Sequence, residues 1–471
     1  MAARYWVGGT GTWDASSTTN WSATSGGLGG ASAPTSADTV TFDTLSGTGT
    51  CTTASGAVCS SCTMSSLLVN LTLGANLTMS GTFTLTNNTL TLGSNTLQCN
   101  IFSSNNSNTR AIAFGTGKIN VTGNGVTIFD FTTATNFTYT GTSQVNFTYS
   151  GATGTRTCVF GTGATESNVL NYNVTGGTDT FAQGNNFKNL DFTGFSGNAL
   201  GNASSQMNCY GNLTLSSTMT VSSSAVAVLA FSATSGTQVF TTNGIALEHP
   251  ITINGTSTVQ LGSALTIGLT RTLTLTTGTF DANNYNVTTG LFSSQNSNIR
   301  TIKMGSGTWT ILASGTNWST LTTTNLTLTA NTSTVNFTST SAKLMANGFG
   351  LTYYNIVNSG TGAFTLFNGG AFNNVTSLAG CPITFTSGQA YSSNTFTFVG
   401  TPSAPITIAP SSTTNYTLTK LGGGIVDMQN VSISRCTASL STGTWYAGAS
   451  TDGGNNTGIR FVSAPKFQQM F

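Results

Sequence analysis

The sequence predicts an all-β protein in which short strands stack as a parallel β-helix or another β-solenoid. Three observations predict this fold. Charged residues make up only 5% of the 471 residues and hydrophobic residues 38%, so a core can be buried although helix formers such as Glu and Lys are scarce. Apolar residues alternate with Thr or Asn, as in half-buried strands. A long motif also recurs further along the chain, and no linker separates its two copies.

The alternation is clearest over residues 71–85. Apolar residues there occupy odd positions: Leu71, Leu73, Leu77, Met79, Phe83 and Leu85. Thr favours strands, whereas Asn and Gly favour the turns between them. Such short segments continue to about residue 435, which favours a solenoid. A stack of β-sandwiches is the alternative, but Asn- and Thr-rich turns suit ladders between stacked coils. No fixed coil length is visible.

An internal repeat divides the chain. Phe102–Arg110 recurs as Phe292–Arg300, at an offset of 292 − 102 = 190. The same offset relates Thr82–Leu85 to Thr272–Leu275, and Val145–Thr148 to Val335–Thr338. We therefore expect a duplicated solenoid with four parts. They are an aromatic-rich N-terminal cap or attachment region (1–62), two solenoid modules (63–250 and 251–440), and a C-terminal cap and tail (441–471).

The N-terminal region holds Trp6, Trp13 and Trp21, which are three of the six tryptophans. A solenoid exposes an apolar cross-section and unpaired strand edges at its ends, and both need cover. Clustered aromatic side chains therefore predict a cap. The alternative is that they attach the chain to another protein.

The repeated Asn/Ser loops supply the candidate binding residues. These are Asn105, Asn106 and Arg110 in the first copy, and Asn296, Asn298 and Arg300 in the second. We expect the two arginines to hold their loops by hydrogen bonds to backbone carbonyls. Contact with a ligand is the alternative role.

Catalysis is not expected, and no catalytic residue is assigned. A glycan hydrolase needs two carboxylates close together, and the chain has only 11 acidic residues. Asp179 could meet Asp191 or Glu166 if they lie one coil apart. The sole histidine, His249, follows Glu248, but no Ser-His-Asp arrangement can be assigned.

No metal site or cofactor is expected either. Cys59 and Cys62 have the spacing of metal ligands, but a zinc site needs two more. Cys51 is the one cysteine close enough in sequence to be a third. A local disulfide and buried, unpaired thiols are the other interpretations, and the five scattered cysteines are expected in the core.

The charge and hydropathy patterns limit the classes of partner that we expect for this chain. The net charge is +2 with no basic cluster, so nucleic-acid binding is not expected. The longest apolar stretch, residues 225–231, is too short to cross a bilayer, and the first residues lack the apolar core of an export signal. The composition is that of an exposed surface protein, but no export signal is visible. We therefore expect a virion protein that leaves the cell by lysis. Few charges also mean little repulsion between copies, so we expect a homo-oligomer, with a trimer favoured.

The two ends carry a resemblance. The opening has the pattern Trp6-x-Gly-Gly, Trp13-Asp14, Asn20-Trp21, Pro34 and Asp38-x-Val-x-Phe42. It resembles the opening of β-solenoid proteins from phage structural regions and of bacterial autotransporter-like adhesins. The closing pattern, Trp445-Tyr-Ala-Gly followed by Asp452-Gly-Gly-Asn-Asn-x-Gly458, is similar to the end of the same phage proteins, with Ile459 where those have Trp.

This resemblance implies a phage virion protein, either a tail fibre, a spike or a decoration protein. Its partners would be other virion proteins and host-surface glycans, and its location the virion surface. A bacterial cell-surface adhesin, which would be extracellular, is the first alternative. A glycan-cleaving tailspike is the second. The resemblance implies no catalytic residue.

Overall fold

The computed structural model describes residues 2–182, 185–200, 206–221, 227–439 and 443–462. Every regular element in these ranges is a β-strand, and the strands form a β-solenoid of about 18 turns with parallel sheets. The predicted all-β solenoid is therefore confirmed. Internal contacts divide the chain into two units, Met1–Ala233 with Thr241–Ile245, and Thr234–Phe240 with Ala246–Phe471.

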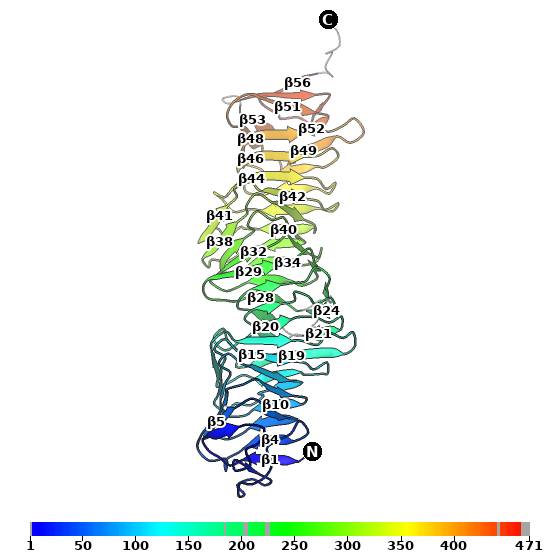
Figure 1. Ribbon diagram of the computed structural model, residues 1–471. Helices are drawn as coiled ribbons and strands as arrows, with labels where there is room; N and C mark the ends of the chain where they lie inside the picture. The colour runs from blue at the N-terminus through cyan, green and yellow to red at the C-terminus, as the bar shows by residue number, and fades with distance from the viewer. Residues whose placement is uncertain (1, 183–184, 201–205, 222–226, 440–442, 463–471) are drawn as a thin grey trace. The chain divides into compact units, whose positions relative to one another are not determined.

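The first unit stacks its strands on successive faces, each strand pairing with the strand one turn away (Figure 1). One face contains β1 (Ala3–Trp6), β4 (Thr39–Phe42), β7 (Ser61–Met64), β10 (Thr82–Leu85), β13 (Ile101–Ser103), β16 (Phe129–Thr133), β19 (Thr155–Thr162), β21 (Thr180–Ala182), β24 (Asn198–Ala199) and β27 (Thr220–Val221). A second contains β2 (Gly11–Trp13), β5 (Gly49–Thr53), β8 (Val69–Leu73), β11 (Asn88–Thr91), β14 (Arg110–Ala113) and β17 (Phe137–Thr140). A third contains β6 (Val58–Cys59), β9 (Leu77–Met79), β12 (Thr96–Cys99), β15 (Lys118–Val121), β18 (Gln144–Phe147), β20 (Asn171–Val174), β23 (Leu190–Asp191) and β26 (Leu213–Thr214). The remaining strands are β3 (Trp21–Ser22), β22 (Asn186–Phe187), β25 (Met207–Cys209) and β28 (Leu229–Phe231).

The second unit is built in the same way. One face contains β29 (Thr237–Thr241), β32 (Thr258–Leu261), β35 (Gly278–Asp281), β38 (Arg300–Lys303) and β41 (Leu326–Thr329). A second contains β31 (Ile251–Ile253), β34 (Thr272–Leu275), β37 (Leu291–Ser293), β40 (Gly315–Ser319), β43 (Lys343–Ala346), β45 (Phe364–Leu366), β47 (Ile383–Phe385), β49 (Ile406–Pro410), β52 (Val431–Ile433) and β55 (Thr451–Asp452). A third contains β30 (Ala246–Leu247), β33 (Leu265–Ile267), β36 (Val287–Thr289), β39 (Thr308–Ile311), β42 (Thr334–Phe337), β44 (Thr352–Asn358), β46 (Gly370–Ser377), β48 (Ala390–Phe398), β50 (Tyr416–Lys420) and β53 (Cys436–Ala438). The last strands, β51 (Ile425–Gln429), β54 (Thr444–Gly448) and β56 (Ile459–Val462), form a small parallel sheet.

The parallel register stacks like residues in the core. Phe83 pairs with Phe102, and Phe102 pairs with Phe129. The ring centroids are 5.5 Å apart in both pairs, and all three side chains are fully buried. The six apolar residues at odd positions of 71–85 are buried in the same way, because side chains alternate across a strand. The alternation seen in the sequence is therefore the inward face of each turn.

Asparagine and glycine shape the corners between strands, as their abundance predicted. Ten asparagines with described geometry adopt a positive φ: Asn88, Asn136, Asn243, Asn283, Asn284, Asn325, Asn331, Asn368, Asn430 and Asn455. Asparagine tolerates this left-handed backbone better than most residues, because its amide can bond to nearby backbone groups. The chain can therefore turn sharply at the corners without a long loop.

Candidate functional site

The two repeated Asn/Ser loops connect strands at equivalent places in the two units. The first joins β13 to β14 and ends at Arg110, and the second joins β37 to β38 and ends at Arg300. The side chains of these arginines are not at the surface, since Arg110 is 1% and Arg300 0% exposed. The loops therefore expose Asn105, Ser107 and Asn108 in the first copy and Ser297 and Asn298 in the second, and they keep Ser104, Ser294 and both cations inside.

Arg110 is bonded to backbone oxygens of its own loop and of the next turn. Its Nη2 donates to the carbonyls of Ser104 and Thr133 at 2.7 and 2.6 Å. Its Nη1 donates to those of Asn108 and Thr135 at 3.0 and 2.8 Å. Burial lowers the pKa of Arg110 to about 10, so the group stays charged at neutral pH. Through these bonds the guanidinium of Arg110 holds two successive turns together, as a clamp would.

Arg300 repeats this arrangement in the second unit. Its Nη1 donates to the carbonyl of Ser294 at 2.5 Å, and its Nε to that of Asn298 at 3.0 Å. Its Nη2 reaches the carbonyls of Thr322 and Thr324 at 3.0 and 2.8 Å. Burial lowers the pKa of Arg300 as well. Both arginines thus make the backbone contacts expected of residues that hold a loop.

The loop asparagines bond mainly to the backbone of neighbouring turns. Asn105 Oδ1 accepts from the Thr133 N–H at 3.1 Å, and Asn106 Nδ2 donates to the Leu85 carbonyl at 3.2 Å. In the second loop, Asn298 Nδ2 donates to the carbonyl of Thr276 at 2.9 Å. Asn296 Nδ2 makes a longer bond, 3.4 Å, to the carbonyl of Leu275. The structure therefore brings the six predicted residues into two separate loops, three in each.

The three N-terminal tryptophans form one cluster. The ring centroids of Trp6 and Trp13 lie 5.1 and 5.3 Å from that of Trp21, both edge-to-face. All three indoles are fully buried, and Phe42 of the next turn packs against Trp6 at 5.9 Å. Strand β3 adds antiparallel to β1, opposite the pairing of β1 with β4. The cluster and β3 thus lie together at the start of the first unit, with all three rings buried.

Asp38 fastens this N-terminal segment. Its Oδ1 accepts from the Ala2 N–H at 2.8 Å, and its Oδ2 accepts from the Thr35 N–H at 3.0 Å. Hydrogen bonds from the backbone of Thr35 and Ala2 and from the Thr35 hydroxyl lower the pKa of Asp38 to about 2. The carboxylate stays ionised and ties the first residues of the chain to the turn at residues 35–38.

Most carboxylates with described contacts form turns. Six aspartates accept a hydrogen bond from the backbone N–H two residues on: Asp14, Asp43, Asp130, Asp191, Asp281 and Asp452. This Asx geometry is a common way to stabilise a tight turn. Asp179, considered above as a partner of Asp191, is held instead by an arginine.

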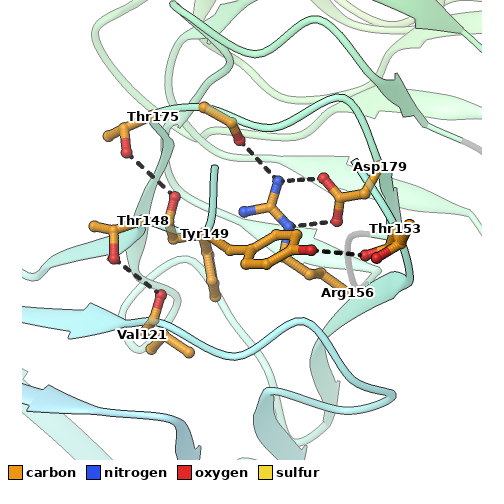
Figure 2. A network of polar contacts seen from close by, with 9 residues as sticks. Val121, Thr148, Tyr149, Thr153, Arg156, Thr175 and Asp179 are labelled. Atoms are coloured by element: carbon orange, nitrogen blue, oxygen red, sulfur yellow. Dashed lines mark hydrogen bonds and ion pairs between the residues drawn. The ribbon is translucent and has the colours of Figure 1, made fainter. Parts of the chain in front are cut away.

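That arginine is Arg156, and the pair is fully buried (Figure 2). Arg156 Nε and Nη2 each lie 2.8 Å from one carboxylate oxygen of Asp179, and Nη2 also donates to the Gly176 carbonyl at 2.9 Å. The guanidinium carbon lies 5.5 Å from the ring centroid of Tyr149, whose hydroxyl donates to the Thr153 carbonyl at 3.1 Å. The pair therefore joins β19, which carries Arg156, to the turn between β20 and β21, which carries Asp179.

A row of polar side chains follows β18, β20, β23 and β26, and all of them reach solvent except Asn146, which is buried. Its eight residues are Gln144, Asn146, Asn171, Asn173, Asn189, Asp191, Asn212 and Thr214, and we call them the amide face. Asn146 is in register with Asn173, Asn173 with Asp191, and Asp191 with Thr214. Successive strands lie about 4.8 Å apart. Seven of the eight line an open groove of about 310 Å³.

Hydrogen bonds between turns order the amide face. Asn173 Nδ2 donates to Asn146 Oδ1 at 3.0 Å, and Asn189 Nδ2 donates to Asn171 Oδ1 at 2.7 Å. Gln144 Nε2 also donates to Asn146 Oδ1, at 3.1 Å. The amide N–H groups thus point to a neighbouring amide, which fixes the side chains in place. Sequence reasoning missed this surface.

The cysteines are part of the core. All eight are buried and reduced, including Cys51, Cys59 and Cys62. Burial raises the pKa of Cys59 to about 12 and that of Cys62 well above the ordinary value. These thiols are therefore protonated at neutral pH. No group of three or more His, Cys, Asp or Glu side chains suited to a metal occurs in the part of the chain that the structure describes.

Comparison with protein-family models, with curated proteins and with solved structures finds no match in any of the three. Over the described ranges, no helix has the length and apolarity needed to cross a membrane.

Proposed function

We propose that this chain is a structural protein of a phage virion, a tail fibre, spike or decoration protein, that offers a rigid surface for attachment or host binding. One observation carries the proposal. The charged groups with the strongest contacts, Arg110, Arg156, Asp179 and Arg300, are buried and bonded within the solenoid. What remains outside is largely Thr, Asn and Ser on a stiff stack of strands. The pattern at both ends supports the phage assignment by resemblance.

The contacts of the acidic residues support a role without catalysis. The carboxylate of Asp179 is neutralised by Arg156 at 2.8 Å inside the protein, and Asp191 Oδ1 accepts from the Thr193 N–H at 2.8 Å. A glycosidase needs one carboxyl group to protonate the leaving group and a second to act as base or nucleophile. A carboxylate fixed in a buried ion pair is unsuited to either task. We therefore propose binding and scaffolding and no reaction.

A homo-oligomer, with a trimer favoured, remains part of the proposal. Charged residues are only 5% of the chain, so little electrostatic repulsion opposes lateral association. Several copies of one weak binding surface would also act together, with a gain of about 10²–10⁴ over a single copy. Sedimentation velocity of the full chain at micromolar concentration measures this directly, and a monomer would contradict it.

The first test is the composition of particles. Virions are purified by density from a lysate of cells that carry the coding sequence, and their proteins are counted by quantitative mass spectrometry. Several copies of this chain per particle would support the proposal. Its absence from particles together with its presence on intact cells would overturn it in favour of an adhesin.

A second test addresses the tailspike alternative. The full chain is incubated with host-surface polysaccharide, and new reducing ends are measured over time. No release is expected. Steady release of reducing ends that needs folded protein would contradict the non-catalytic role.

A further inference from the structure

The amide face of the first unit has hydrogen-bond acceptors left over. Asn173 Oδ1, Gln144 Oε1 and Asp191 Oδ2 accept no hydrogen bond from the residues whose positions are described. The amide nitrogens of Asn173 and Gln144 are already bonded to Asn146, and Asp191 Oδ1 holds its own turn. Each of these amide nitrogens keeps a second N–H group, so the groove offers free acceptors together with N–H donors, and a ligand that fits it has groups that both donate and accept hydrogen bonds.

The charge of the groove narrows the ligand further. Among the described residues that line it there is no lysine or arginine, and Asp191 is the one ionisable side chain. Sulfate, phosphate or carboxylate groups would meet acceptor oxygens and a negative charge, which is unfavourable. A compound with many hydroxyl groups and no negative charge suits this surface, because each hydroxyl can donate to an amide or carboxylate oxygen.

The groove is also fixed before a ligand arrives. Asn173 and Gln144 are on paired strands, β20 and β18, and their amides are ordered by Asn146. Arg156 on β19 and Asp179 in the turn after β20 form a buried ion pair that joins two successive turns of the solenoid (Figure 2). Little conformational entropy is then lost on binding, and this is how a small polar site can gain affinity.

We propose that the amide face binds neutral saccharides through their hydroxyl groups. The inference deepens the proposed function, on which its biological setting rests, by naming the ligand class and the place of contact. None of the described residues that line the groove is aromatic, so no sugar ring stacks on them, and one copy binds weakly. Several copies on one particle would make the contact effective.

The test uses the full chain and a panel of neutral hexose and N-acetylhexosamine oligosaccharides, with sialylated and sulfated oligosaccharides and spermine for comparison. Saturation-transfer NMR detects weak contacts, and titration gives Kd. The key variant combines Asn173→Ala with Asp191→Asn, which removes two acceptors and keeps the strand positions. The matched control is Asn374→Ala in the second unit, where Asn374 Nδ2 donates to Asn355 Oδ1 at 3.0 Å.

We expect at least one neutral oligosaccharide to bind the wild-type chain and the control equally. The double variant should weaken this binding at least about tenfold, which is ~1.4 kcal/mol, with the same melting temperature as the control. Three results would overturn the inference: no neutral saccharide bound at roughly 10 mM, binding of spermine or anionic glycans alone, or neutral binding that the double variant leaves intact.

Failure here and failure of the proposed function are distinguishable. Particle composition by mass spectrometry reports whether the chain is a virion component and does not depend on saccharide binding. A chain found in virions that binds no neutral saccharide would overturn the inference and leave the structural role standing.

Discussion

Arg156 and Asp179 form a two-point ion pair in which both side chains are completely buried, with nitrogen–oxygen distances of 2.8 Å. Two charges leave water to make this pair, and their attraction offsets that desolvation only while both are present. The rings of Phe181 and Phe195, at 5.4 and 5.6 Å from the guanidinium carbon, add cation–π contact. Each of the two buried charges is therefore stable inside the protein only while the other is present.

Removing one partner should cost more than removing both. Asp179→Asn leaves the guanidinium without its counter-charge, so we expect a loss of about 3–5 kcal/mol in the free energy of unfolding. The double variant Arg156→Met, Asp179→Leu should lose less, because no unpaired charge stays buried. Urea unfolding of the full chain followed by tryptophan fluorescence measures both. A double variant less stable than Asp179→Asn would contradict this account.

The two clamp arginines allow a paired test of structure against binding. Arg110→Ala and Arg300→Ala each leave backbone carbonyls without donors, so we expect a loss of about 2–3 kcal/mol for each. Lysine at either site keeps the charge but loses the planar fork that reaches several carbonyls, so its melting temperature should fall between wild type and alanine. Scanning calorimetry measures these shifts. Alanine variants with wild-type stability and lost cell binding would instead assign the arginines to a contact surface.

The sequence predicted the parts of the structure that depend on local pattern. Alternating residues such as Leu71 and Leu73 are buried because the period of two is a property of any strand. Arg110 and Arg300 were found because the repeat marks them. These features need no knowledge of which turn lies beside which.

The rest depends on the length of each turn, which varies. Gln144 is followed one turn later by Asn171, after 171 − 144 = 27 residues, and Asn189 follows Asn171 after 189 − 171 = 18. Without a fixed coil length, the rows of the amide face cannot be aligned from sequence. The same holds for Arg156 and Asp179, which are 179 − 156 = 23 residues apart. The only sequence signal for this ion pair was that two residues of opposite charge occur in a chain that is 5% charged.

Asp38 predicts an acid-sensitive N-terminal segment. Hydrogen bonds hold its pKa at about 2 in the folded protein, below the ordinary value of 3.8. Its stabilising effect is therefore present above pH 3.8 and is lost as the pH falls toward 2. Asp38→Asn should be less stable than wild type at pH 6, by about 1–2 kcal/mol, and the gap should narrow near pH 2. Tryptophan fluorescence during urea unfolding at each pH measures this, because three of the six tryptophans are in this segment.

Asp14→Asn is a useful comparison for Asp38. Backbone hydrogen bonds from Ser16 and Ser17 lower the pKa of Asp14 too, but this carboxylate is in a local turn and does not join distant parts of the chain. Its replacement should leave the tryptophan signal nearly unchanged. Equal effects of the two substitutions would mean that Asp38 does not fasten the segment.

The buried thiols predict a loss of stability at high pH, whereas Asp38 predicts a loss at low pH. Burial raises the pKa of Cys59 to about 12 and that of Cys436 to about 12, from an ordinary value of 9.0. The folded protein keeps these protons while the unfolded chain releases them, so stability is full below pH 9 and falls as the pH rises toward 12. Each thiol contributes a slope of up to about 1.4 kcal/mol per pH unit in that range. Urea unfolding from pH 8 to 10.5 should show this decline, and Cys59→Ala should be less stable at pH 8 but lose less on going to pH 10.5. A variant with the same slope as wild type would show that the Cys59 thiol does not couple folding to pH.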